Sequence, residues 1–198
     1  GAGGISIAVI RFHKQEIETK GMTGSDSFGG NDFTLCLTNF LEKKVREVCS
    51  TPNEKVVEKI REASEILKLN LSKVPKGKVQ IDNISGDKDF ICFVERKEFE
   101  KTFKDIVEKK IATLVENLLQ NIQIKKSEID KIILAGGSTR VPYLETIFTK
   151  LFGKEKLNKT VNADEAVTQG ASLLPAFLRG STSIGKMIVS DLIPNCFY

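Results

Sequence analysis

The segment 132–142 constrains the fold of this chain more than any other part of its sequence. It reads Ile-Ile-Leu-Ala-Gly-Gly-Ser-Thr-Arg-Val-Pro, and apolar residues at helical spacing follow at Leu144, Ile147, Phe148 and Leu151. This order predicts a strand, a glycine turn and a helix. Glycine lets a ligand approach the backbone, and a helix start favours oxygen-rich anions, so a nucleotide is the natural ligand. A tight turn without a ligand is the alternative.

Composition and charge narrow the class of protein. The chain has 198 residues, of which 40% are apolar and 28% charged, as expected for one large or two small soluble domains. The formal charge of +4 is mild, and the paired lysines at 43–44, 109–110 and 125–126 fit exposed helix faces better than a nucleic-acid site. No apolar run reaches the roughly 18 residues of a membrane span, and no signal peptide opens the sequence. We therefore expect neither nucleic acid nor membrane as a partner.

The cysteines and the single histidine do not suggest catalysis or metal binding. Cys36, Cys49, Cys92 and Cys196 are far apart and form no CxxC pair. Reduced thiols favour a cytoplasmic setting. His13 falls in a predicted hairpin turn, so Ser138 has no histidine to complete a catalytic triad. We expect no catalytic residue and no metal ligand in this chain.

Periodicity and turn residues predict strands alternating with long helices. The expected strands are 5–12, 16–22, 79–84, 90–94 and 187–189, the first two forming a hairpin. The expected helices are one after Asn31 or Asp32, which can cap it, with apolar positions Phe33, Leu37, Phe40, Leu41, Val45 and Val48, and others over 54–73, 97–123 and 164–178. The predicted inner side chains of the helix 54–73 are Val57, Ile60, Ala63, Leu67 and Leu71. Those of the helix 97–123 are Phe99, Phe103, Ile106, Val107, Ile111, Leu114 and Leu118.

This alternation predicts an α/β fold. The strands 79–94 lie between two long helices, so residues 31–115 are interpreted as an α+β subdomain inserted into a core formed by 1–30 and 116–188.

Three glycine-rich stretches can offer backbone N–H groups to phosphate or sugar oxygens. They are Gly1, Ala2, Gly3 and Gly4, the pair Gly29 and Gly30, and the pair Gly136 and Gly137.

Three polar residues share one face of the helix 54–73. Glu65, Lys68 and Ser72 could bind the ribose hydroxyls and base edge of a nucleotide, or form an ordinary Glu–Lys surface pair of about 0.2–0.5 kcal/mol. Asp164, at the start of a predicted helix, is first of all an N-cap.

The segment 134–142 resembles the adenosine-binding signature of the heat shock protein 70 superfamily. Other stretches agree with that family in the same order, namely the hairpin 5–22 and the segments 28–33, 65–68, 96–100 and 162–167. The resemblance implies an actin-like ATPase fold, related to ribonuclease H, of which this chain is the second lobe. It also implies ATP or ADP with Mg²⁺ in the parent protein. The first ATPase lobe and a peptide-binding domain are then partners in cis, and residues 189–198 begin an interdomain linker.

The resemblance assigns roles residue by residue. It implies that Gly1 to Gly4 touch the β- and γ-phosphates and that Gly29 and Gly30 lie near the nucleotide. It places Glu65, Lys68 and Ser72 around adenine and ribose, and Asp164 at the floor of the site. The turn under the adenosine is implied to consist of Gly136, Gly137, Ser138 and Arg140.

Three positions depart from the family pattern. Gly4 and Ser6 stand where the family usually has threonine and aspartate, and Leu69 replaces a basic residue that stacks on adenine. A cation over the ring would be worth about 0.5–2 kcal/mol, and Leu69 keeps only apolar contact.

These departures resemble the heat shock protein 110 branch, which binds ATP and acts as a nucleotide exchange factor and holdase for its chaperone relatives. The implied partners are a heat shock protein 70-type chaperone or its co-chaperones, and unfolded client proteins. One alternative is a divergent ATPase chaperone that couples hydrolysis to peptide release, and another is a lobe without nucleotide affinity. We expect no hydrolysis by this lobe alone. The endoplasmic reticulum lumen remains the alternative to the cytoplasm.

Overall fold

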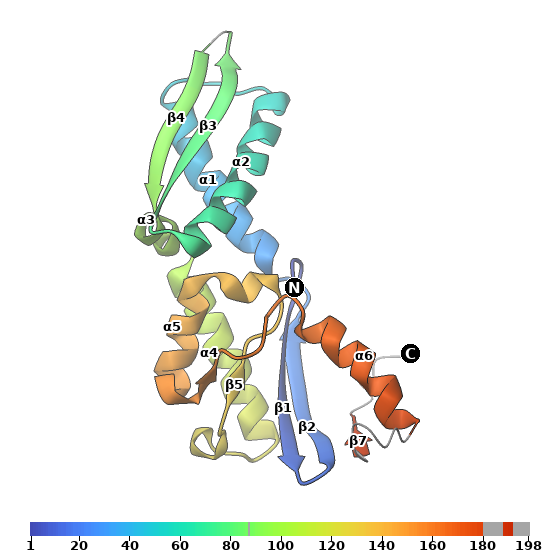
Figure 1. Cartoon of the computed structure of the whole chain (residues 1–198). Coiled ribbons are helices and arrows are strands. Elements are labelled where there is room, and N and C mark those ends of the chain that lie inside the picture. Colours follow the sequence, from blue (N-terminus) through green and yellow to red (C-terminus); the bar gives the residue numbers. More distant parts are fainter. Residues whose placement is uncertain (87, 180–187, 192–198) are drawn as a thin grey trace, which may run out of the picture.

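The structure, a computed structural model, describes residues 1–86, 88–179 and 188–191. The two helices and two strands of residues 30–95 form one end of the molecule, and the hairpin of residues 5–25 with helices α4 (Lys104–Asn121) and α5 (Pro142–Phe152) forms the other (Figure 1). One hydrophobic cluster runs from Phe28 through both ends to Phe148. The mixture of strands and helices confirms the predicted α/β class.

The hairpin at the start of the chain is confirmed. Strand β1 (Ile5–His13) pairs antiparallel with β2 (Glu16–Ser25), and β2 also pairs in parallel with β7 (Ile188–Ser190). A Cβ placed at Gly21 would lie 2.5 Å from Cγ2 of Ile122. The glycine therefore lets β2 pack closely against the end of α4.

Helix α1 (Gly30–Arg46) starts one residue earlier than its predicted caps. The cap is Gly29, whose amide donates to Oδ2 of Asp32 at 2.7 Å. The assignment of Asn31 or Asp32 as cap is wrong, because the Asp32 carboxylate reaches back over one turn as in a capping box. Phe33, Leu37, Leu41 and Val45 are buried as predicted, Phe40 is partly buried, and Val48 lies beyond the helix and is exposed.

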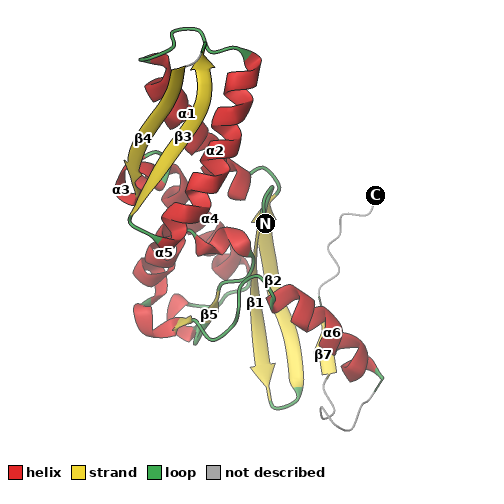
Figure 2. Cartoon of the chain, turned by 45° about the horizontal axis from the view of Figure 1, so that its top comes forward, coloured by secondary structure: helices red, strands yellow, loops and turns green. Residues whose placement is uncertain are grey.

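Helix α2 (Glu54–Lys73) has the predicted bounds, because Oδ1 of Asn53 caps it by accepting from the amide of Val56 at 3.0 Å. Ile60, Leu67 and Leu71 are buried as expected and Ala63 is partly buried, but Val56 takes the inner position predicted for Val57. Strands β3 (Lys76–Ser85) and β4 (Lys88–Glu95) pair antiparallel, and α1 and α2 cover one face of this small sheet (Figure 2).

The predicted helix 97–123 is two helices, α3 (Arg96–Lys101) and α4 (Lys104–Asn121). The chain leaves helical geometry at Phe103, where φ is −132° and ψ −15°. The change in direction buries the Phe103 ring, which packs edge-on against Phe33 at 4.8 Å and Phe99 at 4.9 Å between centroids. Ile106 is consequently 68% exposed, which contradicts its predicted inner position, and Leu114 is only partly buried.

The strand, glycine turn and helix predicted for 132–152 are present. Strand β5 (Ile132–Ile133) pairs in parallel with β6 (Leu157–Asn158). A 3₁₀ turn η2 (Gly137–Arg140) follows and α5 (Pro142–Phe152) begins only after it, so the helix does not start at the glycines. Leu144, Ile147 and Phe148 are buried, and Leu151 is partly buried.

Helix α6 (Ala166–Leu178) ends the main described part of the chain. The predicted strand at 187–189 corresponds to β7, although position 187 lies outside the described residues. Residues 189 and 190 belong to β7 and 192–198 are not described, so the linker at 189–198 stays a prediction. The bounds of the inserted subdomain, 31–115, also stay a prediction.

Replacement of Phe103 by alanine should lower the free energy of unfolding by about 3–5 kcal/mol, because its ring is only 2% exposed and its removal leaves a cavity. The matched change Ile106→Ala, on the exposed face of α4, should stay within about 0.5 kcal/mol of wild type. Urea denaturation followed by circular dichroism measures both. Equal effects of the two substitutions would contradict the helix break.

Candidate functional site

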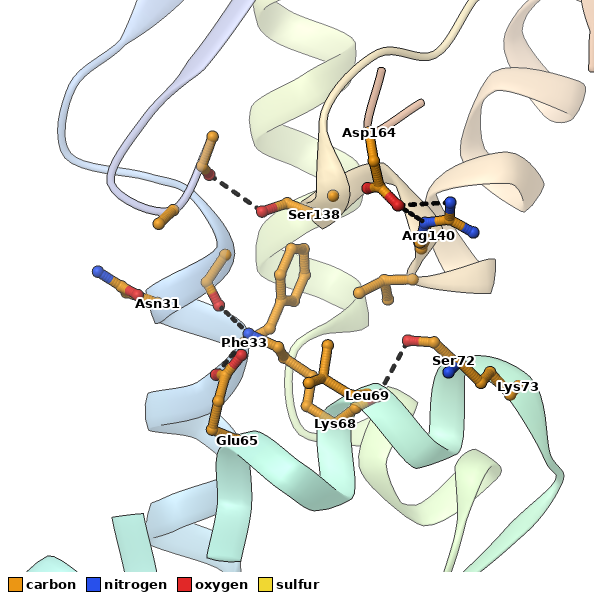
Figure 3. Close-up of a pocket in the computed structure, with 15 residues that line it drawn as sticks. Asn31, Phe33, Glu65, Lys68, Leu69, Ser72, Lys73, Ser138, Arg140 and Asp164 are labelled. Carbon is orange, nitrogen blue, oxygen red and sulfur yellow. Dashed lines mark hydrogen bonds and ion pairs between the residues drawn. The ribbon is translucent and has the colours of Figure 1, made fainter. Parts of the chain in front are cut away.

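A cavity of about 810 Å³ lies between the start of α1, the second half of α2, the turn η2 and the beginning of the chain (Figure 3). The structure brings eleven of the fifteen predicted site residues into its lining: Gly1, Ala2, Gly30, Glu65, Lys68, Leu69, Ser72, Gly137, Ser138, Arg140 and Asp164. These residues come from segments far apart in the sequence, and the fold brings them together around one cavity.

The other four predicted residues, Gly3, Gly4, Gly29 and Gly136, are not part of this lining. A Cβ at Gly29 would lie 2.5 Å from the Gly4 nitrogen and 2.6 Å from the Ala2 oxygen, so two backbone segments meet there. Gly136 has φ +94° and donates its amide to Ala163 O at 2.6 Å. Both positions need glycine, since a side chain would not fit at the first and would be strained at the second.

The amides at the start of α1 already have acceptors. Gly30 N donates to Gly1 O at 2.9 Å, Asn31 N donates to Ala2 O at 2.7 Å, and Gly29 N is bonded to Asp32. The expectation that Gly29 and Gly30 offer free N–H groups to a ligand is therefore wrong in this structure. The carbonyl oxygens of Gly1 and Ala2 already accept hydrogen bonds from these α1 amides.

The turn η2 presents its amides differently. Within the described residues, the amides of Gly137 and Ser138 have no hydrogen-bond acceptor. The Ser138 hydroxyl donates to Gly1 O at 3.1 Å, which ties the turn to the beginning of the chain. A Cβ placed at Gly30 would collide with that hydroxyl, so a glycine is needed where the two segments meet.

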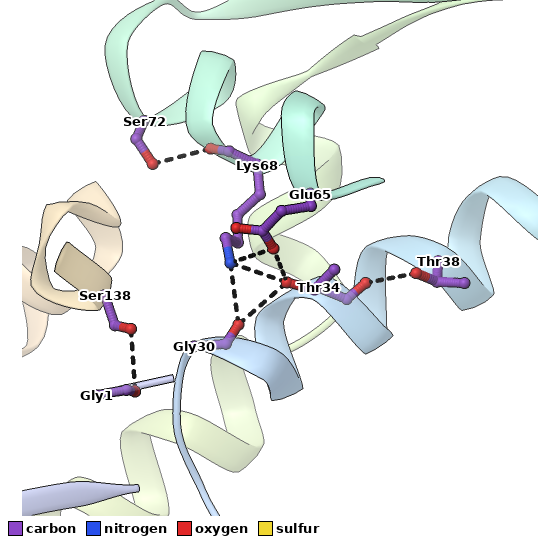
Figure 4. A network of polar contacts seen from close by, with 8 residues as sticks. All are labelled: Gly1, Gly30, Thr34, Thr38, Glu65, Lys68, Ser72 and Ser138. Atoms are coloured by element: carbon purple, nitrogen blue, oxygen red, sulfur yellow. Dashed lines mark hydrogen bonds and ion pairs between the residues drawn. The ribbon is translucent and has the colours of Figure 1, made fainter. Parts of the chain in front are cut away.

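Lys68 is the best-connected polar side chain of the cavity (Figure 4). Its ammonium is 2.6 Å from Oε2 of Glu65 and 2.9 Å from Oγ1 of Thr34, and donates to Gly30 O at 3.3 Å. Thr34 itself donates to the same Glu65 oxygen at 2.5 Å. Lys68 is only 8% exposed, so the simple surface pair considered from the sequence is wrong. The cluster joins α2 to the first turn of α1.

These contacts set the charge state of Glu65. Partial burial acts to raise the pKa of its carboxyl group, but the hydrogen bonds from Lys68 and Thr34, with the Lys68 charge, outweigh burial and hold the pKa below its usual value. Ser72, on the next turn, donates to the Lys68 carbonyl at 2.9 Å. The three polar residues predicted to share a helix face do line the same cavity.

Arg140 and Asp164 form the wall opposite α2. Oδ2 of Asp164 accepts from Nε of Arg140 at 2.8 Å and lies 2.5 Å from its terminal nitrogen, and Asn162 Oδ1 accepts at 3.2 Å. The hydrogen bond from Arg140 lowers the pKa of Asp164 and raises that of Arg140. The expectation that Asp164 caps α6 is wrong, because its carboxylate turns toward Arg140 while Asn162 O accepts from the amide of Ala166 at 2.9 Å.

Four lining residues are not among those that the sequence predicts for the site: Asn31, Phe33, Lys73 and Val141. The sequence indicates other roles for Asn31 and Phe33, as a cap and a core position of α1. Helical spacing could have predicted Lys73 as a lining residue, since it lies four residues after Leu69 and hence on the same face of α2.

Neither a metal cluster nor a membrane span is present in the described residues. They contain no group of three or more histidine, cysteine, aspartate or glutamate side chains that could hold a metal ion. No helix within 1–86, 88–179 or 188–191 combines the length and apolarity needed to span a bilayer.

The fold and the cavity define the class as a mixed α/β protein with a small-molecule cavity bordered by glycines. Comparison with known proteins identifies its family. A family model described as "Hsp70 protein" matches residues 1–197. Heat shock cognate 70 kDa protein 3 of Dictyostelium discoideum is 31% identical over 98% of this chain and 31% of its own length. A ribosome-associated molecular chaperone of Eremothecium gossypii is 32% identical over 91% of this chain and 30% of its own.

The chain belongs to the heat shock protein 70 family. The predicted actin-like fold is thereby confirmed, since the ATPase domain of this family has that fold. The chain spans about 30% of the length of the curated relatives it matches. The resemblance read from the segment 134–142 is confirmed at the level of the family.

Replacement of Glu65 by glutamine should lower the free energy of unfolding at pH 7 by up to about 1 kcal/mol, because the Glu65 carboxylate is about half exposed and water partly screens its interaction with the buried Lys68 ammonium. The pKa of Glu65 is lowered in the folded state, so its contribution is complete above the pKa of the unfolded chain and is lost as the pH falls through the lower pKa of the folded state. Urea denaturation at several pH values should show wild type and variant converging in acid.

Glu62, an exposed glutamate of the same helix, provides the control. Glu62→Gln should leave stability nearly unchanged at every pH. A difference between wild type and Glu65→Gln that stays constant into strong acid would contradict the role of the carboxylate.

Proposed function

We propose that the cavity binds an adenine nucleotide, ATP or ADP, as part of the ATP-binding unit of a chaperone. The observation that carries this proposal is the convergence of residues expected to bind that ligand, including Glu65, Ser72, Gly137 and Arg140, on one cavity. Its volume lies within the roughly 300–1,000 Å³ of small-molecule sites. Membership of the heat shock protein 70 family supports the same ligand.

The two ends of the cavity suit different parts of a nucleotide. Asn31 and Ser138 lie at one end in Figure 3, and Ser72, Lys73 and Arg140 lie at the other. The first end is backbone-rich, with the open amides of Gly137 and Ser138, and suits phosphate or sugar oxygens. The second carries the apolar side chain of Leu69 across from the planar Arg140 guanidinium, a combination that suits the faces of a purine ring.

Magnesium would enter this site with the nucleotide. Mg²⁺ is usually held through substrate phosphates, waters and one or two carboxylates. The described residues contain no group of acidic side chains that could hold it, so we assign no Mg²⁺ ligand to this chain. We propose that such groups, with the first phosphate loop, come from a first ATPase lobe in cis.

We further propose the wider arrangement implied by the family. Residues 1–30 and 116–188 form the core of the second lobe, 31–115 its inserted subdomain, and 189–198 the start of a linker to a peptide-binding domain. Phosphoryl transfer depends on positioning and charge stabilisation from both lobes, so this lobe alone does not hydrolyse ATP. Within the described residues, Cys36, Cys49 and Cys92 are half-buried free thiols, which fit a reducing compartment, the cytoplasm, with the endoplasmic reticulum lumen as the alternative.

Within the family, we propose an exchange factor and holdase of the heat shock protein 110 kind. Gly4 and Ser6 lack the hydroxyl and carboxylate that assist metal and phosphate in the ATPase chaperones, and Leu69 cannot stack as a cation on adenine. Its partners would be a heat shock protein 70-type chaperone or co-chaperones and unfolded clients. The second candidate is a divergent ATPase chaperone, favoured by the names of the relatives, which are 70 kDa heat shock proteins and a ribosome-associated chaperone.

Replacement of Gly137 by valine should abolish nucleotide binding, because a branched side chain would stand between the ligand and the η2 backbone and press on Oδ1 of Asp164, 3.3 Å from an added Cβ. Calorimetric titration with ATP, ADP and adenosine in the presence of magnesium measures the loss. Gly170→Val is the control, since nothing lies within 4 Å of a Cβ at Gly170. Unchanged affinity of the Gly137 variant would refute the site.

ATP turnover by the intact protein separates the two candidate functions. For an exchange factor we expect slow turnover that a J-domain protein and a peptide do not stimulate, together with accelerated ADP release from a heat shock protein 70-type partner. Strong stimulation by the J-domain protein would refute the exchange-factor assignment and leave the ATPase chaperone.

A further inference from the structure

Three cationic side chains line the cavity, and two of them are neutralised by neighbours. Lys68 is paired with Glu65 at 2.6 Å and Arg140 with Asp164 at 2.5 Å. Lys73 is the third, and it has no ion-pair or hydrogen-bond partner within the part of the chain that the structure describes. Among the side chains of the lining, Lys73 therefore supplies the one positive charge that no described carboxylate compensates.

The position of Lys73 follows from the helix. It is the last residue of α2, four residues after Leu69, so the two side chains are neighbours on one helix face. Lys73 is exposed and Leu69 is half exposed, and both line the cavity. Figure 3 shows them with Ser72 across the cavity from Arg140.

We propose that Lys73 is a nucleotide-binding residue that supplies the cation missing at Leu69. Helical spacing places its four-carbon stem beside Leu69 on one face of α2, so that its ammonium can close the base end of the cavity opposite Arg140. There it contacts the purine, over the ring face or at a ring nitrogen, which accepts a hydrogen bond. This inference rests on the proposed adenine-nucleotide site and adds a specificity residue to it.

The base, and not the phosphates, is the part of the ligand that Lys73 reaches. Lys73 lies beside Ser72 at the end of the cavity away from Asn31 and Ser138 (Figure 3). The open amides of Gly137 and Ser138 belong to the other end, which the oxygen-rich part of the nucleotide would fill. A contact to the base predicts the same loss of affinity for adenosine as for ATP.

The test is calorimetric titration of the intact protein with ATP and with adenosine. We expect Lys73→Met to weaken both ligands by the same factor, about tenfold, the size of one cation–π contact. Lys73→Arg should retain affinity, and adding Leu69→Arg to Lys73→Met should restore it. Lys55→Met removes the same charge from the exposed start of α2 and should change nothing.

The outcomes distinguish a failure of the role of Lys73 from a failure of the proposed adenine-nucleotide site. Unchanged affinity of Lys73→Met, with an unchanged unfolding midpoint, would overturn the role of Lys73 and leave the adenine-nucleotide site standing. Weaker ATP binding with unchanged adenosine binding would place Lys73 at the phosphates and overturn its contact to the base. Absence of binding by wild type to either ligand would overturn the proposed function and this inference with it.

Discussion

The site depends on the buried ammonium of Lys68. A charge removed from water is costly unless it is paired and hydrogen-bonded, and Lys68 meets that requirement with a carboxylate, a hydroxyl and a backbone carbonyl. Two of these three groups, Thr34 and Gly30, belong to α1. The hydrogen bonds from Lys68 to Thr34 and Gly30 therefore hold the start of α1 against the second half of α2, and removing the Glu65 carboxylate would leave the buried Lys68 charge without its counter-ion.

Backbone contacts hold the rest of the cavity around this junction. The carbonyls of Gly1 and Ala2 accept from the first amides of α1, and the Ser138 hydroxyl donates to the same Gly1 carbonyl. Gly29 and Gly30 permit these approaches, since a side chain at either would meet another segment. The beginning of the chain thus connects α1 with the turn η2. On the side of the cavity opposite α2, the ion pair with Asp164 holds the Arg140 guanidinium in place.

The sequence predicts those features of the fold that depend on local interactions. The bounds of α2 are predicted from the periodicity of its apolar residues and the turn residues that flank it, and the grouping of Glu65 and Ser72 follows from helical spacing. What it misses depends on contacts between distant segments. The break at Phe103 arises because aromatic rings from α1, α3 and α5 surround that side chain. The bond from Thr34 to Glu65 spans 31 residues, and no periodicity predicts it.

The pairing of the side chains also limits how this lobe can hold a ligand. Glu65, Lys68, Arg140 and Asp164 are engaged with one another, so a nucleotide either competes with those pairs or binds through groups that remain open. Within the described residues the open groups include two amides of η2, the side-chain amide of Asn31, the apolar side of Leu69, and Lys73. Arg140 and Asp164 are half exposed even at the cavity wall, which leaves one side of a bound ligand uncovered. In the arrangement proposed above, a first ATPase lobe in cis would cover that side of the nucleotide.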